Sequence, residues 1–131
     1  MIEHIKNGSQ LLAVVVPANF TTTDVEFVTD PANSQQLGIL FHKGGDTIAS
    51  HVHRPHERII YDTQETLIIR KGKVRVNFYS DQQDFLQSRV LASGDIVLLI
   101  SGGHGFEMIE DTLMVEIKQG PYISDKDKVR F

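Results

Sequence analysis

The stretch that decides the fold is Lys73-Val74-Arg75-Val76-Asn77-Phe78-Tyr79, in which polar and apolar side chains alternate without interruption. Successive side chains of a β-strand point to opposite faces, so this alternation predicts a strand that buries its three apolar residues on one side. The preceding stretch, Glu65–Arg70, also reads as a strand, and Lys71-Gly72 between the two indicates a turn. The sequence therefore predicts a β-hairpin in the middle of the chain.

The same period of two recurs along most of the chain, whereas helix-period stripes are hard to find. Because many short strands leave no room for crossover helices, we expect an all-β fold with antiparallel pairing, closed as a barrel or paired as a sandwich. Of the two we expect a small β-barrel with a filled or ligand-holding interior. The predicted strands are Gln10–Val16, Val25–Thr29, Gln36–His42, Ile48–His53, Glu65–Arg70, Lys73–Tyr79, Phe85–Leu91, Ile96–Leu99, Gly105–Ile109 and Leu113–Gln119.

Length and composition restrict the class of protein. A chain of 131 residues is the size of one domain, and its net charge of −4, from 13 basic and 17 acidic residues, provides no basic surface for nucleic acid. Neither a secretory signal nor a membrane-spanning apolar stretch is visible, so we expect a cytoplasmic protein with no membrane partner. The chain has no cysteine, which leaves His, Asp and Glu as its metal ligands.

Two histidines, His51 and His53, lie two residues apart in a predicted strand. On a strand both imidazoles point into the same space, which is half of a metal site. Strand alternation places Glu65 on the same face as Leu67 and Ile69, where an unpaired charge would be costly. A metal ion would be a suitable partner for that carboxylate.

Three stretches resemble the two sequence motifs of the cupin superfamily. The resemblance covers the chain from about Gly38 to Glu116 and implies a single cupin-like domain over residues 1–131, a jelly-roll barrel with its metal-binding core at about 38–116. It also implies a homodimer formed through N-terminal strands. The stretches are Gly45-Asp46-Thr47-Ile48-Ala49-Ser50-His51-Val52-His53, then Glu65-Thr66-Leu67-Ile68-Ile69-Arg70-Lys71-Gly72, and finally Gly94-Asp95-Ile96-Val97-Leu98-Leu99-Ile100-Ser101-Gly102-Gly103-His104.

By this resemblance His51, His53, Glu65 and His104 bind a divalent transition metal, either Fe, Mn, Ni, Zn or Co. The sequence departs from the family in two places. The second motif lacks the usual proline before its glycine, and 11 residues separate His53 from Glu65 where cupins usually have three or four. Glu57 fits the shorter spacing and is a rival ligand, whereas Glu65 keeps the family's distance to the turn glycine and is preferred.

The inserted segment 54–64 carries further candidate residues. Arg54 and Arg58 are candidates for binding an anionic carboxylate or phosphate of a substrate. His56, Glu57 and Tyr61 are candidates for a catalytic role. The alternative interpretation, which we favour for the arginines, is an extended hairpin with solvated charges.

Three functions are compatible with these residues. The first is a metal-dependent enzyme, a dioxygenase or an isomerase, acting on a small polar or anionic molecule. The second is a metal-free isomerase or epimerase of nucleotide-linked sugars, in which a barrel histidine is the general base. The third is a non-catalytic barrel that binds a small ligand, because one fold serves many functions.

Overall fold

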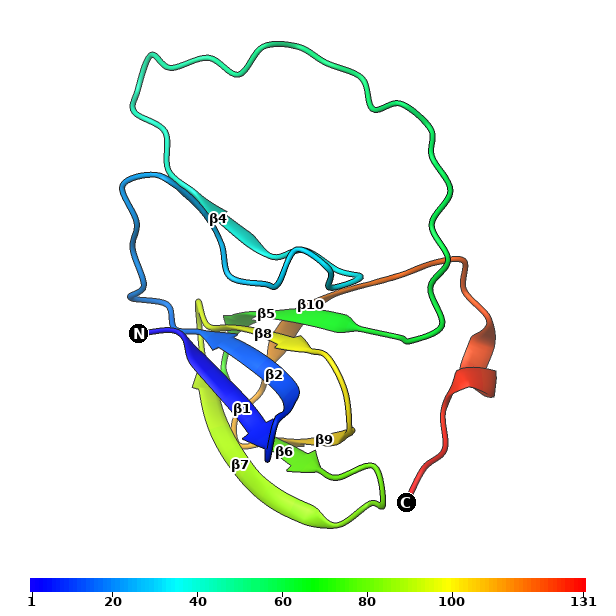
Figure 1. Cartoon of the computed structure of the whole chain (residues 1–131). Helices are drawn as coiled ribbons and strands as arrows, with labels where there is room; N and C mark the ends of the chain where they lie inside the picture. The colour runs from blue at the N-terminus through cyan, green and yellow to red at the C-terminus, as the bar shows by residue number, and fades with distance from the viewer.

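The computed structural model describes all 131 residues and is almost entirely β (Figure 1). All strand pairs are antiparallel, so the predicted all-β antiparallel fold is confirmed. The only helical segment, η1, is four residues long. The structure has no helix with the length and apolar character needed to cross a membrane. The elements are β1 (Glu3–Asn7), β2 (Gln10–Val16), β3 (Val25–Phe27), β4 (Gly38–Leu40), β5 (Glu65–Lys71), β6 (Lys73–Tyr79), β7 (Phe85–Ala92), β8 (Ile96–Leu99), β9 (Gly103–Met108), β10 (Leu113–Lys118) and η1 (Ser124–Asp127).

The strands divide into three sheets, with strand orders β1-β2-β8-β5-β10, β7-β6-β9 and β3-β4. No strand is shared between sheets, so they do not close into the barrel that the sequence predicted. A closed barrel needs every edge strand to be paired, and here β10 and β9 each end a sheet. The structure is therefore a two-layer arrangement of the larger sheets, with the short β3-β4 ribbon beside them (Figure 1).

The core lies between the two larger sheets. On β6 the apolar residues Val74, Val76 and Phe78 are all buried, as their alternation predicted. On β5 the inward positions are held by Leu67 and Ile69. Residues of both sheets join in one apolar cluster, which consists of Ile5, Leu12, Ala13, Val15, Leu67, Ile69, Val74, Val76, Phe78, Leu91, Val97 and Leu99.

A glycine makes the β5-β6 turn possible. Gly72 has a φ of +91°, a left-handed conformation that side-chain-bearing residues rarely adopt. A Cβ atom at this position would overlap the backbone oxygen of Asp111 and lie 2.8 Å from Thr112. The turn at Gly72, which the sequence predicted, is thus also the place where the β9-β10 connection packs closely against the hairpin.

The predicted strand Ile48–His53 is wrong. The connection from β4 to β5 extends away from the sheets as a wide arc (Figure 1), and every residue from 41 to 63 is exposed. Residues 47–63 form no hydrogen bond between two backbone groups. Alternation in a sequence describes a strand's two faces but not its neighbour, and here the stretch has no neighbouring strand to pair with.

The N-terminal strand β1 was not predicted, because Glu3–Asn7 contains a single apolar residue, Ile5. Its pairing with β2 holds it in place. β1 is an edge strand, whereas β2 is enclosed between β1 and β8 and is buried on both faces from Leu12 to Val16. That burial agrees with the apolar character of the stretch.

Candidate functional site

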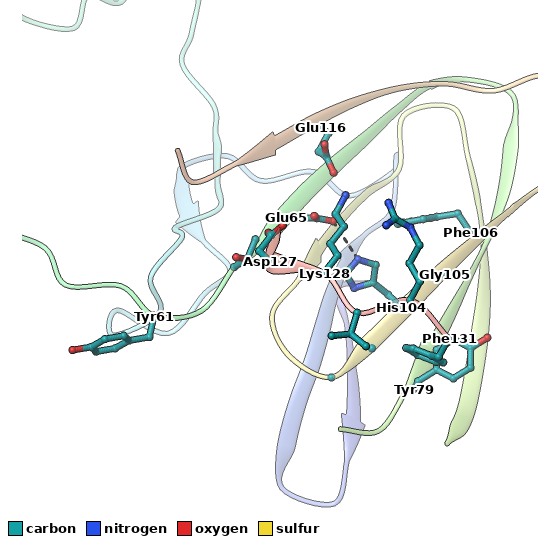
Figure 2. A pocket seen from close by; sticks show the side chains of 15 residues that line it. Tyr61, Glu65, Tyr79, His104, Gly105, Phe106, Glu116, Asp127, Lys128 and Phe131 are labelled. Atoms are coloured by element: carbon teal, nitrogen blue, oxygen red, sulfur yellow. Dashed lines mark ion pairs between the residues drawn. The ribbon is translucent and has the colours of Figure 1, made fainter. Parts of the chain in front are cut away.

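Glu65 and His104 meet across the gap between the two larger sheets. Glu65 begins β5, and it follows the inward alternation of Leu67 and Ile69. His104 lies opposite Phe78 in the register of β9 and β6, which places it on the inward face of β9. His104 Nε2 lies 3.2 Å from Glu65 Oε2 (Figure 2).

The carboxylate of Glu65 is buried and surrounded by positive groups. Its residue is only 6% exposed, whereas the His104 side chain is 32% exposed. Lys118 lies opposite Glu65 in the β10-β5 register, with its Nζ atom 4.0 Å from Glu65 Oε1. A hydrogen bond from His104 lowers the pKa of Glu65, and the charges of His104, Lys118 and Lys128 act in the same direction, against the raising effect of burial. The group is therefore held as a carboxylate.

A cavity of about 890 Å³ opens beside this pair. Its polar wall includes Glu65, His104 and Glu116, so a small molecule in the cavity would contact both members of the pair. The full lining consists of Tyr61, Thr63, Glu65, Tyr79, Gly102, Gly103, His104, Gly105, Phe106, Glu116, Asp127, Lys128, Val129, Arg130 and Phe131.

The C-terminal segment forms one side of the cavity. The ring of Phe131 packs edge-on against Tyr79, with 5.0 Å between the ring centroids. Both Tyr79 and its register partner Gly103 lie on the outward face of their sheet, whereas Lys128 acts on the inward Glu65. The segment is exposed throughout and runs past the edge strand β9, from Lys128 near Glu65 to Phe131 on Tyr79 (Figure 2).

The other two predicted metal ligands lie elsewhere. His51 and His53 are both exposed in the β4-β5 connection, with their ring centroids 5.3 Å apart, and neither lines the cavity. His51 Nδ1 lies 2.8 Å from the backbone oxygen of Ala49. Nowhere in the structure do three or more His, Asp or Glu side chains gather closely enough to hold a metal ion. The structure thus brings together two of the four predicted ligands, Glu65 and His104.

The candidates of the inserted segment are also exposed. Arg54, His56 and Glu57 do not line the cavity, so Glu65 rather than its rival Glu57 is the carboxylate beside a predicted histidine. Arg58 lines a second, smaller cavity of about 370 Å³. Tyr61 borders both cavities, although its side chain is 96% exposed and points away from the pair (Figure 2).

Sequence reasoning missed the two lysines near the pair. Lys118 lies in a strand that was predicted, but its position opposite Glu65 depends on the register of two strands far apart in the chain. Lys128 belongs to the charged C-terminal segment, to which the sequence analysis assigned no candidate residue. Its clustered charges gave no signal of the cavity beside it.

Comparisons of the chain with protein-family models, with curated proteins and with solved structures found no match.

Proposed function

We propose that this chain is a small metal-binding protein of the cupin type. In this proposal Glu65 and His104 hold a divalent transition metal from one side, and His51 and His53 of the β4-β5 connection complete the site. The observation that carries the proposal is the meeting of Glu65 and His104 at 3.2 Å beside a cavity. Two residues far apart in the sequence converge there from two different sheets.

The donor atoms at the pair suit the proposed ion. A carboxylate oxygen and an imidazole nitrogen are ligands that Fe, Mn, Ni, Zn and Co accept, and a metal is a suitable partner for a buried carboxylate. Glu65 is held in its charged form, which is the form that binds a metal. The two residues in place therefore fit half of a mixed nitrogen and oxygen site.

The β4-β5 connection is long enough to supply the other half. Twelve peptide steps from His53 to Glu65 span up to about 40 Å in an extended chain. Because residues 47–63 form no hydrogen bond between two backbone groups, moving them breaks no such bond. His51 and His53 would share one face of a strand added beside β9, and in the register that places this face on the side of His104 both would point toward the cavity.

Such an added strand would also extend the smaller sheet beyond β9, its present edge. We propose that the jelly-roll barrel forms when this strand is added. A bound ion would supply Lewis-acid or dioxygen chemistry in the cavity. The function proposed for the complete site is a dioxygenase or an isomerase acting on a small polar or anionic molecule.

Metal uptake tests the proposal directly. Purified protein, stripped with a chelator and dialysed separately against Mn²⁺, Fe²⁺, Co²⁺, Ni²⁺ and Zn²⁺, is expected to retain one ion per chain, measured by elemental analysis. The affinity should fall by at least about 100-fold in His104→Ala and in the double variant His51→Ala/His53→Ala, since loss of a ligand exceeds the loss caused by its outer partners. His42→Ala removes an imidazole near the start of the same connection and is the matched control.

The two variants separate the two halves of the site. Equal metal uptake by the wild type and the His51→Ala/His53→Ala protein would refute the role of the connection. Equal uptake after His104→Ala would refute the site at the pair. Circular dichroism spectra of all variants establish that the sheets are intact.

The contact between Glu65 and His104 also favours a second function, metal-free proton transfer on a nucleotide-linked sugar. A carboxylate that accepts a hydrogen bond from His104 Nε2 orients the imidazole and leaves Nδ1 as a proton acceptor. Chelator-treated protein should then exchange a sugar C–H proton with deuterated water. His104→Gln should abolish this exchange, by about 100-fold or more, while His53→Asn leaves it unchanged.

The same assay separates the remaining functions. Proton exchange that requires added metal or His53 would favour the metal-dependent enzyme over metal-free proton transfer by Glu65 and His104. Ligand-induced thermal stabilisation with no turnover, with or without metal, would instead identify a non-catalytic binding protein.

A further inference from the structure

The outer face of the five-stranded sheet, which is turned away from the core, is unevenly covered. One row of side chains crosses this face from β2 to β10 and consists of Val14, Leu98, Thr66 and Ile117. The first three residues are at most 5% exposed, whereas Ile117 is 49% exposed. The covered part of the outer face therefore ends before β10.

The edge strand β10 carries an uncovered apolar row along its length. Leu113, Val115 and Ile117 lie on its outer face, and all three are exposed. Met114, which alternates with them, packs against the core on the opposite face. An exposed apolar edge strand is a place where a further strand can pair.

The backbone of β10 is also free on its outer edge. Ile69 N–H donates to Asp95 O, so the backbone groups of Ile69 point toward β8 rather than toward β10. This direction alternates along β5, and the partner of Ile69 on β10 is Met114. The N–H and C=O groups of Met114, Glu116 and Lys118 therefore point off the edge of the sheet, where no strand follows.

The other edge of the same sheet, β1, is unsuited to pairing. It presents Glu3, His4 and Lys6, and its register with β2 shifts after Ile5. Charged side chains and an irregular register protect an edge strand against further pairing. A second chain would therefore add at β10, and not at the N-terminal strand that the resemblance implied.

The charges of β10 fit a second copy of the same strand. Two copies related by a two-fold axis run antiparallel, and an axis at residue 117 places Glu116 opposite Lys118 of the partner subunit, twice by symmetry. Glu116 takes part in none of the ion pairs within the chain. An axis at residue 116 would instead bring two glutamates face to face, and one at residue 115 would place Glu116 opposite a methionine.

We propose that this chain forms a two-fold symmetric homodimer by antiparallel pairing of β10 with β10 of a second copy, in the register that places Ile117 opposite itself. The free backbone groups of Glu116 and Lys118 then exchange hydrogen bonds across the axis. The apolar row of the outer face continues from one sheet into the other. The interface contains none of the proposed metal ligands, so it does not depend on the metal site.

Sedimentation equilibrium over a range of protein concentrations tests the dimer. Wild-type protein is expected to associate reversibly into dimers. Ile117→Lys places two ammonium groups opposite each other and should raise the dissociation constant by at least about tenfold. Val90→Lys is the matched control, because Val90 is 50% exposed on β7, an edge strand of the three-stranded sheet, and it should leave the constant within about twofold of the wild type.

Single cysteines locate the two-fold axis. The chain has no cysteine of its own, so an introduced thiol can form a disulfide only with another copy. Ile117→Cys should give a covalent dimer on a non-reducing gel after mild oxidation, because facing Cα atoms of a non-hydrogen-bonded pair lie about 4.5 Å apart. Val115→Cys should not, since its two copies would be offset by about 13 Å along the strands.

These measurements can each overturn the proposal. A wild type that sediments as a monomer at every concentration would do so, as would a dimer that Ile117→Lys weakens no more than Val90→Lys. Disulfide formation by Val115→Cys but not by Ile117→Cys would overturn the register, and so would failure of both to cross-link. Loss of metal uptake with unchanged association would refute the metal site alone.

Discussion

Replacing Phe78 with alanine is expected to lower the free energy of unfolding by about 3–5 kcal/mol, the usual cost of removing a fully buried aromatic ring. Phe78 is 1% exposed and is the largest fully buried side chain of the chain. It lies in β6, the central strand of the three-stranded sheet, and points toward the five-stranded sheet. Its removal leaves a void between the two layers that neighbouring side chains fill only in part.

Phe85→Ala is the control for Phe78→Ala. Phe85 is also in the smaller sheet but is 60% exposed, and its aromatic contact with Tyr79 has a centroid distance of 5.8 Å. Losing that contact should cost about 1 kcal/mol. Both values are obtained from chemical denaturation. A Phe78→Ala cost no greater than that of Phe85→Ala would contradict a core centred between the sheets.

Gly72→Ala is expected to cost about 3 kcal/mol or more. An alanine at a φ of +91° carries about 1–2 kcal/mol of backbone strain, and its methyl group must also displace the Asp111 backbone and Thr112. The displaced connection joins β9 to β10, so the change should loosen both strands. Denaturation midpoints measured with an unchanged denaturant dependence report the loss.

Gly45→Ala separates backbone strain from steric overlap. Gly45 has a similar φ of +94°, but an added Cβ atom there meets nothing within 4 Å. Its substitution should cost only the strain, about 1–2 kcal/mol, and less if the exposed turn relaxes. If the two substitutions were equally costly, the close approach at Gly72 would have no energetic weight.

The parts of the fold that depend on local sequence could be predicted. β6 begins and ends at the predicted residues, and Glu65 lies on the apolar face that alternation assigned to it. Both results follow because consecutive side chains of a strand point to opposite faces, so the local sequence shows which residues share a face. The resemblance implied that Glu65 and His104 share a site, and the structure places the two side chains in contact.

The parts that depend on distant partners could not be predicted. The stretch Ile48–His53 alternates like a strand, yet Ile48 and Val52 are 63% and 89% exposed because no strand lies beside them. Lys118 faces Glu65 only through the β10-β5 register. Register is set by contacts between whole strands, which a single sequence read by its local pattern does not contain.

The wide arc between β4 and β5 tolerates sequence change that the sheets do not. Stability resides in the sheets, since residues 41–63 are all exposed and residues 47–63 form no hydrogen bond between backbone groups. The entropic cost of closing such a connection grows only slowly with its length, by about 0.6 kcal/mol per doubling. Insertions, deletions and substitutions in the arc therefore leave the scaffold folded, and new ligand chemistry is able to evolve there without a compensating change in the core.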